Sequence, residues 1–463
     1  ENKVVSVYNQ TELDIFTITV VDVFPENTVL SRSLQVESFY SGNNSEWTLM
    51  QSAGSAALPA YTKHGEVLTL LGDVPDFGNP ISSVEHGGSI WFVNINPMAS
   101  LNQFSAGLHT QPGVTRVDLN TQKIVDRVAL NTLPDIEQSY YAVSTGTKLW
   151  LACSKLVTPG SDQRVILREV IVGTPGTSTL GPAVTIYTDL GGLTYPTGLV
   201  YDNTNNKLWI SHTASSPDAS SVVQADPVTG APGVPLAVGL SDEALSILVI
   251  DNNIGNYGDL KPRLYIGNST ASTIQAISDL DVNPPTLDGP AVAAGTPVTT
   301  LAMGVNRLYA GSYITGDVAS YTVNPIVADV VPFSLLEGVW AMTFSAADNR
   351  VLVLTWDTIS QYRVIKLSVS LVYVSDILLP AKEDKVQLTL PGSFVVALGY
   401  IWAPNPSVQN GLAIGDPRGR GYRVDLALTT TVELLTLESI NWDTVGNSIS
   451  WRPDGRGDAT TWY

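Results

Sequence analysis

The stretch Tyr195-Pro-Thr-Gly-Leu-Val-Tyr-Asp-Asn-Thr-Asn-Asn-Lys-Leu-Trp-Ile-Ser-His212 decides how the rest of the chain is interpreted. It contains an apolar run, Gly198 to Tyr201, a polar turn, Asp202 to Asn206, and a second apolar run around Trp209. Asn and Asp tolerate left-handed backbone angles and bond their own backbone, so this cluster favours a turn. The pattern is typical of a β-hairpin.

The same hairpin recurs along the chain, with Trp, Tyr or Leu at a fixed place in the second run. Trp91, Trp150, Tyr265, Tyr309 and Trp402 mark five further copies. The copies span 81–94, 140–153, 195–212, 245–268, 298–312, 340–355 and 394–405, with a weaker one at 440–451. The spacing between landmarks is roughly 43 to 59 residues, a period typical of propeller blades.

A third strand that ends in an acidic turn follows several hairpins. Examples end at Asp118, Asp226 and Asp425, and a fourth strand follows at 123–130. These features predict an all-β fold, a β-propeller of seven to eight four-stranded blades. We expect residues 76–463 to form the propeller. Residues 1–75 hold strands that pack on it or close it, so that the ring is closed by N- and C-terminal strands.

Composition narrows the class of protein. Hydrophobic residues make up 44% of the 463 residues and charged residues only 14%, which predicts a large buried core. The formal charge of -19 opposes binding to nucleic acid or anionic membrane surfaces. No apolar run approaches the roughly 18 residues of a membrane-spanning helix. The one cysteine, Cys153, is expected to be a buried apolar residue.

Several weak features favour an extracellular or cell-surface glycoprotein. The sequence opens at Glu1 rather than Met, which suggests a removed leader, and lysine is scarce. Asn-x-Ser/Thr sequons, the candidate glycosylation sites, begin at Asn9, Asn43 and Asn268.

Part of the chain resembles a known superfamily. The Val-Asp-x-x-Thr-Gly and Asn-Lys-Leu-Trp-Ile phrasing looks like the surface-layer, NHL and gluconolactonase-like propellers, over about residues 76–463. Glu337-Gly-Val-Trp340 is similar to the metal-ligating Glu-Gly-Pro-x-Trp of the gluconolactonase-like family, and Pro196-Thr-Gly198 to its Pro-Asn-Gly. Val339 replaces the proline and Thr197 the asparagine ligand, so the resemblance implies the fold and does not assign lactonase activity.

Carboxylates stand just before the innermost strand of several predicted blades. The candidate ligand-binding residues are Asp76, Asp135, Glu137, Asp242, Glu243, Glu337 and Glu438. If they converge at the axis, they make a negative mouth suited to a cationic ligand or a divalent cation such as calcium. Glu137, Glu243 and Glu337 are the candidate metal ligands. The alternative is that these acids cap turns and face water.

Other motifs give less information about function. His86 and His212 are the only histidines placed by the repeat, and we expect both in turn or surface roles. Arg456-Gly-Asp458 matches an integrin-binding tripeptide, but a polar turn explains it as well. Trp442, Trp451, Trp462 and Tyr463 form either a sugar platform or the packing of a closing blade.

Two functions stay open on the sequence alone. The first is a secreted or surface-exposed binding or structural module that contacts a protein, a glycan or its own copies through blade loops. The second is a lactonase- or hydrolase-type propeller enzyme with an axial metal that polarises a carbonyl or activates water.

Overall fold

The computed structural model divides the chain into two compact units, residues 1–76 with 435–463, and residues 77–434. It describes residues 16–23, 29–41, 47–51, 61–63, 66–68, 80–95, 112–121, 124–130, 136–158, 162–190, 194–213, 220–237, 246–335, 337–356, 362–379, 392–405 and 420–434. In the first unit, β1 (Phe16–Val23), β2 (Val29–Ser41) and β3 (Trp47–Gln51) form an antiparallel sheet. A hairpin of β4 (Tyr61–Lys63) and β5 (Glu66–Leu68) is separate from that sheet.

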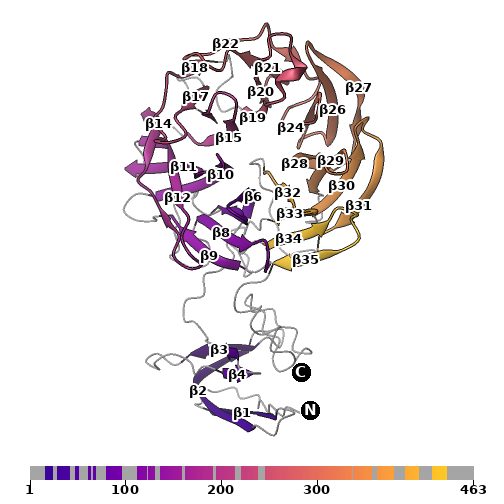
Figure 1. Cartoon of the computed structure of the whole chain (residues 1–463). Helices are drawn as coiled ribbons and strands as arrows, with labels where there is room; N and C mark the ends of the chain where they lie inside the picture. Colours follow the sequence, from indigo (N-terminus) through magenta and orange to yellow (C-terminus); the bar gives the residue numbers. More distant parts are fainter. Residues whose placement is uncertain are drawn as a thin grey trace. The chain divides into compact units, whose positions relative to one another are not determined.

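The second unit is a seven-bladed β-propeller (Figure 1). Each blade is an antiparallel sheet of strands that are consecutive in the chain. The blades, numbered in chain order, are β6 (Pro80–His86), β7 (Ser89–Asn94), β8 (Gly113–Asp118) and β9 (Ile124–Ala129); β10 (Ile136–Ser144), β11 (Leu149–Thr158), β12 (Asp162–Ile171), β13 (Thr179–Leu180) and β14 (Val184–Leu190); β15 (Pro196–Asp202), β16 (Lys207–His212), β17 (Ser221–Ala225) and β18 (Leu236–Ala237); β19 (Ser246–Asp251), β20 (Arg263–Asn268), β21 (Thr273–Ser278), β22 (Thr286–Leu287) and β23 (Val292–Ala293); β24 (Thr300–Met303), β25 (Arg307–Gly311), β26 (Asp317–Val323) and β27 (Ile326–Ser334); β28 (Gly338–Ser345), β29 (Arg350–Trp356), β30 (Tyr362–Ser368) and β31 (Tyr373–Leu378); and β32 (Val395–Ala397), β33 (Tyr400–Asn405), β34 (Arg420–Asp425) and β35 (Thr431–Leu434).

The predicted hairpin of the opening stretch is confirmed. Strands β15 and β16 pair antiparallel down to Asp202 opposite Lys207. Asp202 Oδ1 accepts the backbone N–H groups of Thr204 and Asn205, and Asn206 has a left-handed φ of 55°. The turn therefore forms for the reason that its sequence indicates, namely self-capping Asx residues.

The acidic turns after the third strands are also confirmed. Asp118 Oδ1 accepts the N–H of Thr121 at 2.7 Å, and Asp226 Oδ1 accepts that of Thr229 at 2.7 Å. Asp425 Oδ1 caps the equivalent turn of the seventh blade through the N–H of Thr429 at 2.7 Å. These bonds favour the ionised carboxylates and lower the pKa of Asp118 and Asp226.

Alternation of strand direction gives each blade two ends. We call the end where first strands begin and second strands finish the loop face. The opposite end, with the turns from first to second and from third to fourth strands, is the turn face. A β-bulge lies near the loop-face end of the first strand in four blades, between Pro80 and Ser82, Ser139 and Tyr141, Pro196 and Gly198, and Val339 and Ala341. Such bulges bend a strand and re-aim its side chains at the rim of a site.

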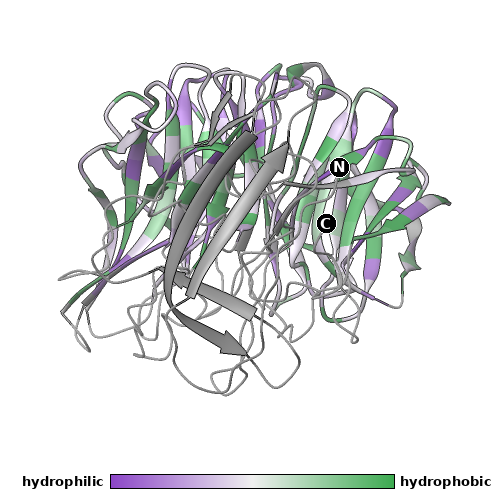
Figure 2. Cartoon of the chain, turned by 90° about the horizontal axis from the view of Figure 1, so that it is seen from below, coloured by the Kyte–Doolittle hydropathy of each residue, from purple (hydrophilic) through white to green (hydrophobic). Residues whose placement is uncertain are grey.

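The landmark aromatic residues pack between adjacent blades. Trp91, Trp209, Trp402, Tyr265, Tyr309 and Trp150 are all at most 2% exposed. Trp150 Nε1 donates to the carbonyl of Pro227 in the third blade, and Tyr265 Oη to that of Val323 in the fifth. Tyr309 Oη bonds the carbonyl of Val369 in the sixth. Hydrophobic residues fill the strands and hydrophilic ones gather nearer their ends (Figure 2).

One consequence is measurable. Tyr309→Phe keeps the ring but removes the 3.1 Å bond to Val369, leaving a carbonyl at a blade interface without its donor. We expect the free energy of unfolding to fall by about 1 kcal/mol, the usual net value of such a bond. Urea unfolding measures it, with Tyr201→Phe as the control, because the Tyr201 hydroxyl bonds Asn206 in an exposed turn. Equal stability of the two variants would contradict the interface role.

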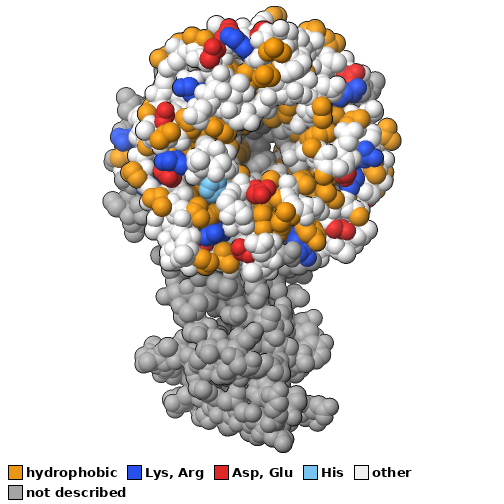
Figure 3. Space-filling view, viewed as in Figure 1, with side chains coloured by type: hydrophobic (Ala, Val, Ile, Leu, Met, Phe, Trp, Pro, Cys, Tyr) orange, Lys and Arg blue, Asp and Glu red, His pale blue; other side chains and the backbone are white. Residues whose placement is uncertain are grey.

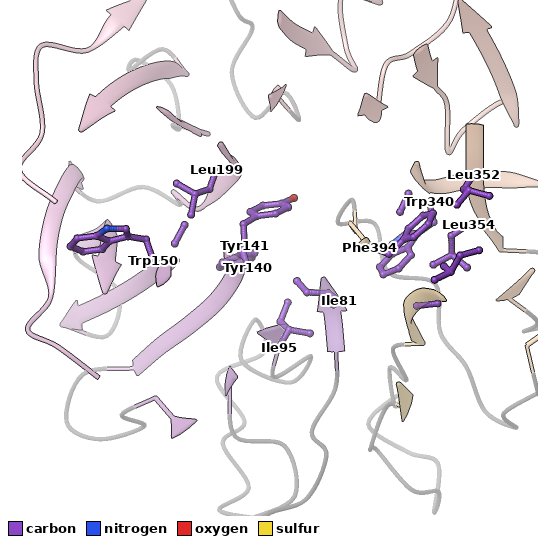
Figure 4. Packing of buried hydrophobic residues seen from close by; sticks show 14 of the residues in the cluster. Ile81, Ile95, Tyr140, Tyr141, Trp150, Leu199, Trp340, Leu352, Leu354 and Phe394 are labelled. Carbon is purple, nitrogen blue, oxygen red and sulfur yellow. The ribbon is translucent and has the colours of Figure 1, made fainter. Parts of the chain in front are cut away.

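The ring closes between the first and the seventh blade. Ser83 N donates to Ser393 O and Ser393 N to Ile81 O, both at 3.2 Å, while Ser83 Oγ donates to Trp402 O at 2.8 Å. Ile81, Phe394 and Trp340 belong to one buried cluster that continues into the second blade (Figure 4). The first and the seventh blade are thus joined by packing and hydrogen bonds. No described strand of residues 1–75 belongs to the sheet of a blade. The hairpin predicted at 440–451 lies outside the described residues.

Candidate functional site

Of the predicted acidic residues, the structure describes Glu137 and Glu337. Asp76, Asp135, Asp242, Glu243 and Glu438 lie outside the described residues, as do the sequons at Asn9 and Asn43, the Arg456–Asp458 tripeptide and the C-terminal aromatic residues. Both described glutamates stand at the loop-face end of a first strand, Glu137 within β10 and Glu337 directly before β28.

Glu137 is buried in an ion pair inside the second blade. Its carboxylate is 1% exposed, and both of its oxygens accept hydrogen bonds from Arg168 of β12, from Nε at 2.7 Å and Nη2 at 2.6 Å. Lys155 Nζ of β11 lies 3.8 Å from Oε1. The bidentate geometry is the strongest that a carboxylate and a guanidinium can form. This glutamate therefore ties the first strand of its blade to the third.

Glu337 has a similar arrangement in the sixth blade. Thr355 Oγ1 donates to its Oε2 at 2.5 Å, and Arg363 Nε of β30 lies 3.4 Å from its Oε1. The same arginine donates from Nη1 to Asp376 of β31 at 2.7 Å. Because Glu337 is 19% exposed and Arg363 32%, this pair is more accessible to solvent than the one in the second blade.

These two carboxylates do not fit a cation site. Arginine stays protonated in proteins, so each glutamate already faces a fixed positive charge that would repel a metal ion. Across the described ranges, no three His, Cys, Asp or Glu side chains come together as a metal site would require. Glu137 does not match the alternative interpretation, in which such acids only cap turns and face water, because it is buried in an ion pair inside its blade.

The expectation of a surface role for His212 is wrong. The side chain is fully buried at the loop-face end of β16. Nδ1 lies 2.9 Å from the carbonyl of Thr213, which can only accept, so Nδ1 carries the proton and Nε2 accepts from Ser221 Oγ at 2.7 Å. Tyr187 of the second blade stacks on the ring at 4.1 Å. His86 is not in the turn itself: it is the last residue of β6, directly before Gly87 and Gly88, and is 9% exposed, with Nδ1 2.8 Å from Ser144 Oγ.

Burial lowers the pKa of His212 to about 4, although the Thr213 carbonyl and the nearby Asp189 act in the opposite direction. The imidazole is therefore neutral at pH 7. A serine hydroxyl bonded to a neutral imidazole has the local geometry of a nucleophile and its base. Ser221 is only 6% exposed and His212 not at all, so we assign the pair to joining β16, β17 and the second blade.

Cys153 is a free, fully buried thiol, as expected. Burial raises its pKa well above the usual value, with the Glu137 charge adding to the effect. A thiol in this state is unreactive. No helix among the described residues has the length and apolar character needed to cross a bilayer.

The turn face carries several exposed apolar side chains. Several lie in or beside its turns, namely Ile171, Val228, Leu260, Val282, Val305, Val372 and Leu398, each at least 48% exposed. Nearby cations are mostly paired, such as Lys148 with Glu169 and Arg307 with Asp329. Figure 3 shows hydrophobic side chains mixed with basic and acidic ones around a hollow centre on the face that it presents.

Comparison with known proteins yields the fold. No family model matches the chain, and no curated protein matches its sequence. A putative 6-phosphogluconolactonase from Bacteroides uniformis ATCC 8492 aligns with a TM-score of 0.50 and 12% identity over 72% of this chain and 92% of that one. Virginiamycin B lyase from Staphylococcus aureus gives 0.42 and 12% over 71% and 92%. A functionally unknown protein from Desulfotomaculum acetoxidans DSM 771 gives 0.45 and 12% over 69% and 91%. By fold the chain is a seven-bladed β-propeller, and gluconolactonase-like and lyase propellers are among its structural neighbours.

Proposed function

We propose that this propeller is a macromolecular binding module, and that it is not a metal-dependent lactonase or hydrolase. The observation that carries the proposal is the pairing of both described carboxylates at the heads of first strands with an arginine from the third strand of the same blade. These groups stabilise blades and are not open to ligate a metal or to activate water. The metal-dependent alternative thereby loses two of its three candidate ligands.

The turn face supports the positive half of the proposal. Exposed valine and leucine side chains recur at its turns, and cations beside them, such as Lys148 and Arg307, are paired with a carboxylate of their own blade. Apolar side chains that gather on one face of a folded protein mark interaction surfaces. A rigid ring of blades presents such turns with little loss of conformational entropy on binding.

Partner capture followed by reconstitution tests this function. The intact chain should retain a macromolecule from its own source, and the purified partner should then bind it saturably at a fixed stoichiometry. Hydrolysis of aliphatic lactones that Glu337→Gln abolishes while stability is retained would contradict the proposal and revive the enzyme alternative. Arg350→Gln is a matched control, because Arg350 lies at the turn-face end of β29, far along its strand from Thr355.

The proposal includes an extracellular or cell-surface location, which rests on the composition and the sequons. Asn268 can be tested separately from that location. Its side chain is 2% exposed, and its Oδ1 accepts the N–H groups of Thr270 and Ala271, both at 2.9 Å. A glycan needs Nδ2 in solvent, so the folded state disfavours glycosylation here.

We therefore expect that a chain expressed through a secretory pathway carries no glycan at Asn268, even if Asn9 or Asn43 is modified. Mass spectrometry of peptides before and after enzymatic deglycosylation measures occupancy at each sequon. Full occupancy at Asn268 in folded protein would refute the burial argument.

A further inference from the structure

The fourth blade carries the longest of the seven connections between a first and a second strand. Residues 252–262, which we call the 252–262 loop, join β19 to β20 and include the short η3 helix (Ile254–Asn256). Both neighbouring blades hold the loop. Asn252 Nδ2 lies 3.5 Å from the Tyr201 carbonyl of the third blade, and Asn256 Nδ2 donates at 2.9 Å to the Val305 carbonyl of the fifth.

Contacts with residues of the fourth blade also hold the loop in place. The Tyr257 hydroxyl donates to Asp251 at 2.8 Å and lies 2.6 Å from that of Tyr265, and Arg263 stacks over the Tyr257 ring. Asn253 Nδ2 adds a second bond to the Val305 carbonyl at 3.0 Å. The loop is thus organised before any partner binds, which lowers the entropic cost of binding.

Four exposed apolar residues lie on this loop or are linked to it, directly or in steps, through polar contacts of the residues beside them. Leu260, on the loop itself, is 62% exposed, and Val305 is 59% exposed. Val282, 50% exposed, follows Asp281, which pairs with Lys261 next to Leu260. Val234, 53% exposed, donates its N–H to the side chain of Asn283 beside Val282. The four residues span blades three to five, and we call them the apolar row.

Carboxylates border the apolar row. Asp259 and Asp288 bind Arg263, while Asp279 and Asp281 bind Lys261. Four aspartates against two cations leave a formal charge of -2. All four aspartates are between 39% and 54% exposed; of the two cations, Lys261 is 41% exposed and Arg263 only 10%. An approaching partner therefore meets apolar side chains edged with negative charge.

We propose that this surface docks a partner protein that presents apolar side chains bordered by lysine or arginine. The inference rests on the binding function proposed above and specifies where the binding occurs and what chemistry the partner has. Charge complementarity of this kind raises the association rate and fixes orientation, while the apolar contacts supply the affinity.

Other occupants fit less well. A second copy would bring the same acidic border against itself, within a chain whose formal charge is already -19. Nucleic acid would be repelled for the same reason. A glycan is better matched by exposed aromatic faces, and the apolar row consists of valine and leucine.

Selection from a random 12-residue peptide library against the intact chain tests the proposal. We expect the enriched peptides to combine Leu, Ile, Val or Phe with Lys or Arg. Their affinity, measured by fluorescence polarisation, should fall about tenfold or more for the double variant Leu260→Ser and Val282→Ser. Val372→Ser is the matched control, because Val372 is also a 62% exposed turn residue, in the sixth blade. Since all three side chains are exposed, thermal unfolding should be alike in all variants.

The possible outcomes distinguish a failure of the docking surface from a failure of the proposed binding function. Peptides that bind both variants equally would overturn the docking surface but leave the binding function standing. A control peptide of lysine and serine carries the same charge as the enriched peptides but no apolar side chain. If it binds equally well, the binding is a general attraction to an acidic chain, and the docking surface is overturned. If no peptide is enriched and no partner is reconstituted, both the docking surface and the proposed function fail.

Discussion

Arg168→Ala should destabilise the propeller by about 3 kcal/mol, near the lower end of the range for breaking a buried ion pair. The substitution leaves the Glu137 carboxylate, 1% exposed, without its bidentate partner. It also removes the 2.7 Å bond from Arg168 Nη1 to the Gly181 carbonyl. Lys155, 3.8 Å from Glu137, compensates in part, which is why we expect the lower end. Urea unfolding followed by Trp fluorescence measures the loss.

A second variant identifies the cause of that loss. Replacing both partners, Glu137→Leu with Arg168→Leu, removes the buried charge altogether and should regain most of the stability. Lys148→Met provides a control, because Lys148 and Glu169 form a bond of the same length at 27% exposure each, where a pair contributes at most about 1 kcal/mol. If Arg168→Ala and Lys148→Met have equal effects, Glu137 does not depend on its arginine.

Acid should destabilise the protein through His212 by about 3 kcal/mol at pH 4. Burial lowers the pKa of His212 to about 4 in the folded state, against 6.5 for an unperturbed histidine. Above pH 6.5 the imidazole is neutral in both states and contributes no pH dependence. As the pH falls from 6.5 to 4, the unfolded chain takes up a proton that the folded chain excludes, so unfolding becomes more favourable.

Other groups titrate in the same range, so the effect must be isolated by difference. The free energy of unfolding is compared between the protein and His212→Gln at pH 7 and at pH 4. The variant loses the Ser221 and Thr213 contacts at both pH values, but it lacks the acid penalty. Its disadvantage at pH 7 should therefore shrink by about 3 kcal/mol at pH 4. A disadvantage that stays constant would mean that His212 is accessible to protons in the folded state.

The fold could be predicted from the sequence because its signals are local. The turn Asp202–Asn206 and the aromatic landmark seven residues after Asp202 report one hairpin within about a dozen residues, and repetition does the rest. The hairpin signals alone predict seven to eight blades. Seven of the eight hairpin signals form blades, and the last, at 440–451, lies outside the described residues.

The site could not be predicted in the same way, because its partners are distant along the chain. Glu137 meets Arg168 two strands away, and Glu337 meets Arg363 likewise. An alignment of the blades would have given a signal for these pairs. In the second and the sixth blade alike, a glutamate at the start of the first strand is followed by an arginine in the third strand. His212 was misjudged because strand-end positions look exposed until the stacking of Tyr187 from another blade is known.

The apolar row could not be predicted from the sequence for a different reason. A single valine in a turn carries no information, because isolated exposed apolar residues are common. The side-chain bonds of Asn256 and Asn283, together with the Lys261–Asp281 ion pair, link the neighbourhoods of Val305, Leu260, Val282 and Val234 across three blades. Tertiary contacts between turns determine which exposed residues form this surface. The sequence of a single turn does not contain that information.

Thermal unfolding of the intact chain in calcium and in a chelator tests the central claim most directly, namely that the glutamates at the heads of the blades bind arginine and hold no metal. A site occupied at one hundred times its Kd would stabilise the folded state by about 2.7 kcal/mol. We predict the same thermal midpoint in both conditions. A higher midpoint in calcium that Glu137→Gln or Glu337→Gln abolishes would contradict the claim.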